Sequence, residues 1–146
     1  MRGFLVLCDS AGVDRATGKI NMLGAGWSLT GPQVPPMAVA GFLRVPWEEA
    51  KAEHAFTLRL VDGDGEPVRT PFAGEEGALR FGGTLVVDLG EGRDRERAEN
   101  PEIHSGFAVS VPSLPLGPGR YTWTLEVDGD DLASVTFGVR AGLGDR

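Results

Sequence analysis

The stretch D-G-D-G-E at residues 62–66 holds the residue types that most directly suggest chemistry. Asp62, Asp64 and Glu66 place three carboxylates at alternate positions, which is how a calcium-binding EF-hand loop begins. Such a loop also needs glycine at its sixth position and glutamate at its twelfth, where this chain has proline and alanine. The pattern therefore favours a hairpin turn, because Asp and Gly are the residues that tight turns require.

A second acidic run, D-G-D-D at residues 128–131, leaves an alternative open. If both runs lie at the same end of the fold, Asp128, Asp130 and Asp131 join the first three carboxylates around a calcium ion. The turn interpretation remains the stronger one. The sequence therefore assigns no metal ligand and no cofactor, and Asp62, Asp64 and Glu66 stay weak candidates.

No group of residues has the spacing of a catalytic site. The stretch from Gly26 to Thr30 begins like the G-x-S-x-G nucleophile elbow, but it ends in threonine and no strand–turn–helix is expected there. His54 and His104 are the two histidines, and charged neighbours predict that both lie on the surface. We therefore expect a protein that is not an enzyme.

The elements that must position these residues show an alternation of apolar and polar side chains typical of half-buried strands. In Y-T-W-T-L-E-V-D at 121–128 the apolar face includes Trp123, which is predicted to be core. Two runs are apolar on both faces, which predicts strands at a sheet centre. Between Leu23 and Gly26 the phase of the alternation changes, which predicts a β-bulge. The other alternating segments are 56–61, 79–89, 107–111 and 135–139, and the two apolar runs are 4–8 and 37–43.

Together these segments predict an all-β, immunoglobulin-like antiparallel β-sandwich of about seven to nine strands. Tyr121 follows a Pro-Gly turn and opens a strand, which resembles a tyrosine corner. One short connecting helix is expected at 46–54, and an exposed loop is expected at 90–102. The length fits a single domain over residues 1–146.

Charge and composition narrow the partners and the compartment. A net charge of −7 disfavours nucleic acid and anionic membranes as partners. Cys8 is the only cysteine, which excludes an intramolecular disulfide and predicts a small buried side chain. The apolar run near the N-terminus is too short for a signal peptide, and no segment has the length of a membrane span. The cytoplasm is the expected location.

Five motifs resemble those of an uncharacterised family of small bacterial proteins with an immunoglobulin-like fold. The resemblance implies a stand-alone cytoplasmic sandwich in which the acidic stretch is a turn between two strands, and it implies no catalytic residues. The motifs are L-C-D at 7–9, G-K-I-N-M-L-G-A-G-W-S at 18–28, V-P-W at 45–47, L-V-D-G-D-G-E-P-V at 60–68 and L-G-P-G-R-Y-T-W at 116–123.

The function expected from these observations is binding rather than catalysis. The first hypothesis is a protein-interaction or structural module that binds a protein partner or a second copy of itself. Trp27 and Trp47 are its candidate interface residues, because exposed aromatic side chains often anchor interfaces. The alternative is a module that binds a small ligand, a carbohydrate or calcium.

Overall fold

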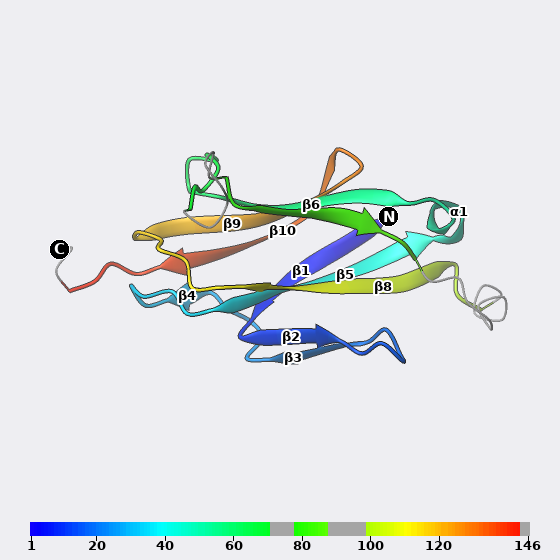
Figure 1. Cartoon of the computed structure of the whole chain (residues 1–146), viewed down its shortest axis with the longest axis horizontal. Coiled ribbons are helices and arrows are strands. Elements are labelled where there is room, and N and C mark those ends of the chain that lie inside the picture. Colours follow the sequence, from blue (N-terminus) through cyan, green and yellow to red (C-terminus); the bar gives the residue numbers. More distant parts are fainter. Residues whose placement is uncertain (71–77, 88–98, 144–146) are drawn as a thin grey trace.

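The computed structural model describes residues 1–70, 78–87 and 99–143, and these form ten strands and one short helix (Figure 1). The elements are β1 (Arg2–Cys8), β2 (Ser10–Val13), β3 (Ile20–Leu23), β4 (Leu29–Thr30), β5 (Met37–Pro46), α1 (Trp47–Ala50), β6 (His54–Val61), β7 (Arg80–Leu85), β8 (Glu102–Val111), β9 (Gly119–Val127) and β10 (Asp130–Val139).

The strands form two larger sheets and a separate hairpin. One sheet has the order β1-β5-β8 and the other has the order β4-β10-β9-β6-β7, while β2 pairs with β3. Every pairing is antiparallel except that of β4 with β10. The prediction of an all-β fold is confirmed. The described strands exceed the predicted number because the segment expected to be one bulged strand forms both β3 and β4, and because β2 has only four residues, too few to show an alternation.

The two larger sheets enclose one hydrophobic core, to which both contribute the inward side of their alternating pattern. Trp123 at its centre has no exposed surface, and its Nε1–H points to Met37 Sδ on the facing sheet at 3.4 Å. Phe56 and Phe107 also stack across the two sheets, with ring centroids 5.6 Å apart. The predicted inward face of 121–128 is therefore confirmed.

The C-terminal hairpin follows from two residues at its tip. Val127 pairs with Asp130, so that Asp128 and Gly129 alone form the turn. Both have positive φ, 52° and 89°, as the turn type that best fits the twist of a hairpin requires. The predicted hairpin is confirmed, and the second acidic run supplies its turn.

The predicted bulge between Leu23 and Gly26 is wrong, because the strand ends there and the chain continues into a different sheet. β3 ends at Leu23, whereas β4 pairs with β10 in the larger sheet. Gly24 and Gly26 have positive φ, and a side chain at Gly24 would collide with the Asp9 carboxylate packed against it. The change of phase therefore marks the point where the chain crosses from one layer to another.

Of the two apolar runs, only the second lies at a sheet centre. β5 runs between β1 and β8 as predicted, but β1 is an edge strand. β1 carries apolar side chains on its outward side for another reason. Cys8, at one end of the strand, is fully buried, and Phe4, near the other end, stacks on the ring of Phe42. Cys8 is fully buried as predicted, and burial raises the pKa of its thiol.

The β2–β3 hairpin forms a third layer, which packs on one part of the outer face of the β1-β5-β8 sheet (Figure 1). Ala38 and Ala40 point outward from β5 and are nonetheless buried. At Gly106 on β8, an added Cβ would lie 2.6 Å from Ile20 Cδ1. The hairpin therefore covers the half of this face that carries small residues and leaves the other half open.

Two connections differ from the sequence prediction. The helix over 46–54 is shortened to one turn, Trp47–Ala50, because His54 already pairs with Leu85 at the start of β6. Of the loop expected at 90–102, residues 90–98 lie outside the described residues. Glu102 belongs to β8, where it pairs with Pro46.

Replacing Trp123 with alanine is expected to lower the free energy of unfolding by about 3–5 kcal/mol, because a large buried aromatic leaves a cavity that the sheets cannot close. Urea unfolding measures this loss. Ser134→Ala, on an exposed position of β10, serves as a control and should change the stability by less than about 0.5 kcal/mol. A cost for Trp123→Ala below about 1 kcal/mol would contradict the assigned core.

Candidate functional site

The acidic stretch at 62–66 is a turn whose first carboxylate is used within the turn. Asp62 Oδ1 accepts hydrogen bonds from the backbone N–H groups of Asp64 and Glu66, at 2.9 and 3.0 Å. Gly65 has a positive φ and donates to the Asp62 carbonyl. The prediction of a turn is confirmed, and the role of Asp62 is to order the backbone.

The two acidic turns lie at opposite ends of β6, so the shared calcium site is wrong. Asp128 N–H donates to the Ala55 carbonyl at the start of β6, whereas Asp62 follows its end. About seven extended residues, or roughly 20 Å, separate them. Asp131 is also occupied, since it pairs with Arg59 at 2.8 Å. Within the ranges described, no three His, Cys, Asp or Glu side chains lie close enough to hold a metal ion.

His54 is buried rather than on the surface, contrary to the sequence prediction. Its Nδ1 lies 2.6 Å from Asp128 Oδ2 and its Nε2 lies 2.7 Å from the Glu49 carbonyl oxygen. Because both neighbours are acceptors, the geometry favours the imidazolium with a proton on each nitrogen. The Asp128 hydrogen bond, followed by that to Glu49, raises the pKa of His54, and the same pair lowers the pKa of Asp128.

The two candidate interface tryptophans are both engaged with the fold. Trp47 is buried, with 8% of its surface exposed, and its Nε1–H donates to the Asn100 carbonyl at 2.8 Å. Trp27 is partly buried against the core, and its Nε1–H donates to Asp9 Oδ1 at 2.7 Å. Trp47 therefore lacks the exposure that an interface anchor needs, because its indole, on the first residue of α1, packs into the core.

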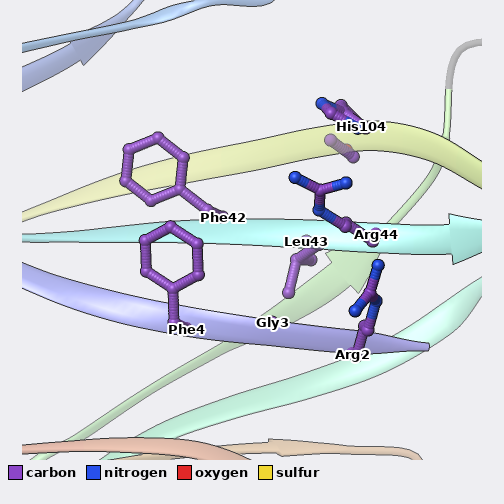
Figure 2. Close-up of a pocket in the computed structure, with 8 residues that line it drawn as sticks. Arg2, Gly3, Phe4, Phe42, Leu43, Arg44 and His104 are labelled. Carbon is purple, nitrogen blue, oxygen red and sulfur yellow. The ribbon is translucent and has the colours of Figure 1, made fainter.

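The open half of the β1-β5-β8 sheet carries a different group of side chains, which we call the outer-face patch: Arg2, Phe4, Phe42, Arg44 and His104. The pairing register places Arg2 opposite Arg44 and Arg44 opposite His104, one row across three strands. Two residues along, Phe4 pairs with Phe42, and their rings stack with centroids 4.9 Å apart and planes 11° apart. Figure 2 shows the two rings side by side, with the three nitrogen-bearing side chains beyond them.

The patch surrounds a hollow of about 460 Å³, whose lining also includes Gly3, Leu43 and Ser105. A second hollow of about 750 Å³ shares Phe42, His104 and Ser105 with the first and extends to the loop between β2 and β3. The two hollows together form a groove that runs from β1 across the open part of the sheet to this loop, and its lining also includes Val86, Val87 and Asn100.

The groove is cationic although the chain as a whole is acidic. Its described lining contributes Arg2, Arg15, Lys19 and Arg44, against Asp14 as the one carboxylate. Asp14 Oδ1 already accepts hydrogen bonds from two backbone N–H groups of its own loop. Local potential at such a surface can therefore have the opposite sign to the net charge of −7.

Sequence reasoning missed the outer-face patch because its residues come from segments far apart in the chain. Phe4 and Phe42 lie in the runs that are apolar on both faces, so neither stood out as exposed. The one available signal was the order A-V-A-G-F-L-R in residues 38–44, where the outward positions change from alanine to phenylalanine and arginine. Only the register of three strands aligns this signal with Arg2 and His104.

Residues 3–140 match the family of unknown function DUF6941, and the chain belongs to this family. No curated protein matches it. Among solved structures, it is similar to the Pseudomonas fluorescens alkylpurine DNA glycosylase AlkC bound to DNA containing an abasic site analog, with 15% identity and a TM-score of 0.41. That likeness covers 78% of this chain and 28% of the glycosylase chain. None of the helices in the described ranges is long and apolar enough to cross a membrane.

Replacing Asp62 with alanine is expected to lower the free energy of unfolding by about 1 kcal/mol, because two backbone N–H groups lose their acceptor. The matched control is Asp64→Ala in the same turn, which keeps the Asp64 N–H and should cost less than about 0.5 kcal/mol. Chemical denaturation measures both. Equal costs for the two variants, or a melting temperature raised by calcium, would contradict the turn assignment.

The His54–Asp128 pair is expected to make stability depend on pH. Because the pKa of His54 is raised, its contribution is complete below the unfolded value near 6.5 and is lost as the pH rises through the folded value. The lowered pKa of Asp128 makes its contribution complete above about 3.9, and that contribution is lost in acid.

The measurement is the free energy of unfolding at about pH 5.5 and about pH 8.5, on either side of the histidine titration. The wild type should lose more stability between these values than Asp128→Asn, which removes the charge and keeps an oxygen for the Ala55 N–H. An equal loss in both proteins would show that the pair does not set this dependence.

Proposed function

We propose that this chain is a non-enzymatic, immunoglobulin-like β-sandwich of the cytoplasm that binds a protein partner, or a second copy of itself, through the outer-face patch. The observation that carries the proposal is the stacked pair Phe4–Phe42 on an open sheet face, set beside Arg2, Arg44 and His104.

The immunoglobulin-like assignment is supported by two features of the fold. Two mainly antiparallel sheets enclose the core, and Tyr121 at the start of β9 donates its hydroxyl hydrogen to the Gly117 carbonyl at 2.7 Å. A tyrosine that opens a strand and bonds backwards to the preceding turn is the tyrosine-corner arrangement. Its effect here is to fix the path by which the chain enters β9.

The binding assignment is supported by the composition of the patch. Phe4 leaves 55% of its surface exposed although it stacks on a second phenyl ring. Aromatic and arginine side chains are the types enriched at protein interfaces, because they combine apolar area with directed hydrogen bonds. Two of the five residues of the patch, Arg2 and Phe4, lie on β1, the edge strand of this sheet.

The non-enzymatic assignment is supported by the surroundings of His54 and Ser28, the residues whose types most suggest catalysis. Both ring nitrogens of His54 are bound within the fold. Ser28 precedes β4, and its carbonyl accepts from Gly138 N–H, so the candidate elbow is an extended segment beside β10. Neither residue has a free reactive neighbour that would activate it for catalysis in the described geometry.

The second candidate is a module that binds a small ligand. Its support is the hollow of about 460 Å³, which lies within the range of roughly 300–1,000 Å³ found for small-molecule sites. The shallow, open position of this hollow on a sheet face favours a macromolecular partner over an enclosed small ligand.

The test is to change the aromatic pair and follow association. Phe4→Asp should abolish partner retention or self-association, measured by affinity capture and native mass spectrometry of the same preparations. The control Ser134→Asp places the same charge on an exposed position of the other sheet and should retain the wild-type behaviour. The proposal fails if the wild type is a monomer that retains no protein, or if Phe4→Asp and the wild type associate equally.

A further inference from the structure

This inference rests on the proposed function and gives its chemistry. We propose that the groove on the outer-face patch binds an acidic peptide segment that carries an aromatic side chain. The carboxylates of the segment face Arg44 and the cations of the β2–β3 loop, and its aromatic group packs on the Phe4–Phe42 pair.

The charge of the ligand follows from the charges that line the groove. Arg15, Lys19 and Arg44 line the groove together with Arg2, whose charge is offset by its ion pair with Glu102. Asp14 binds its own loop, and Glu102 forms a two-bond ion pair with Arg2. At physiological salt the Debye length is about 8 Å, so the acidic remainder of the surface is screened while these cations act at contact.

Arg44 is the side chain best placed to recognise a carboxylate. It is exposed between Arg2 and His104 in the cross-strand row, and it forms no ion pair with any carboxylate that the structure describes. A guanidinium group offers two parallel N–H donors that match the two oxygens of a carboxylate. His104 adds an imidazole N–H donor beside it.

The aromatic part of the ligand follows from Phe4 and Phe42. Two stacked rings with planes 11° apart form a flat apolar surface, and a third ring can pack on it in offset or edge-to-face geometry. A single-stranded nucleic acid would also use stacking and cations, but its phosphate charge would be repelled by a chain of net charge −7 over a longer stretch. A short peptide places its charges only where the groove is cationic.

The length of the segment follows from the width of the sheet. The groove crosses β1, β5 and β8 and continues to the β2–β3 loop. Strands are spaced about 4.8 Å apart, so this path is roughly 15 Å long and holds about four or five extended residues.

The experiment is a titration of the isotope-labelled full chain with the peptide Glu-Glu-Trp-Glu-Glu, followed by amide chemical shifts in NMR. Shifts are expected at the amides that line the groove, including those of Gly3, Phe42 and Ser105. The affinity for this peptide should fall as salt is raised from about 0.05 to about 0.5 M, because salt screens the attraction between its carboxylates and the cations of the groove. Lys-Lys-Trp-Lys-Lys should cause no shifts at these amides.

Two charge-reversal variants provide the comparison. Arg44→Glu should weaken the acidic peptide by at least about tenfold, a loss of about 1.4 kcal/mol. Arg120→Glu makes the same change of charge on β9 in the other sheet and should stay within about twofold of the wild type. Arg44→Gln retains the length of the side chain without its charge. It should also lose binding, and it replaces Arg44→Glu if that variant unfolds.

The outcomes separate this inference from the proposed function. Equal binding of the acidic and basic peptides, shifts outside the groove, tighter binding of a single-stranded oligonucleotide, or no effect of Arg44→Glu would overturn the acidic ligand. If the peptide does not bind while Phe4→Asp still abolishes association, the surface is correct and its chemistry is wrong. If the peptide binds the groove while Phe4→Asp leaves association unchanged, the ligand site stands and the proposed function fails.

Discussion

The pairing register of β5 between β1 and β8 is the constraint on which the candidate surface depends. Leu43 and Val45 must face inward to fill the core, so Phe42 and Arg44 must face outward. A shift of one residue would reverse every side chain of the strand and expose the core positions instead. The burial of the inward face therefore fixes which side chains of β5 face outward, and the register with β1 and β8 then sets Phe4 beside Phe42 and His104 beside Arg44.

The β2–β3 hairpin then decides how much of this outward row remains open. It can approach the sheet only where outward side chains are small, and Ala38, Ala40 and Gly106 provide such a region. The larger side chains farther along β5 prevent the same approach. The groove is thus the boundary between a covered half of the sheet and an uncovered half, which explains why the hairpin loop contributes cations to its lining.

Several polar side chains that suggest chemistry when read alone instead hold segments of this fold in place. Asp62 orders its own turn, Asp9 binds the indole of Trp27, and His54 joins α1 to the β9–β10 turn. Each satisfies a donor or acceptor at a point where the chain leaves regular pairing, which is where unpaired groups are otherwise costly. These acidic and histidine side chains therefore stabilise the fold rather than form a site. The side chains of the cationic groove differ from them, because Arg44 and His104 are exposed on an open sheet face.

The sequence by itself determined the all-β class, the buried face around Trp123, the two Asp-Gly turns and the burial of Cys8, because each depends on alternation or turn chemistry within a few neighbouring residues. The tertiary structure alone decided that residues 20–30 divide between two sheets, that His54 is buried, and that Phe42 and Arg44 lie beside side chains from β1 and β8. These depend on which strands pair and in which register. Long-range packing sets that choice, and alternation along one strand is the same whichever neighbour it finds.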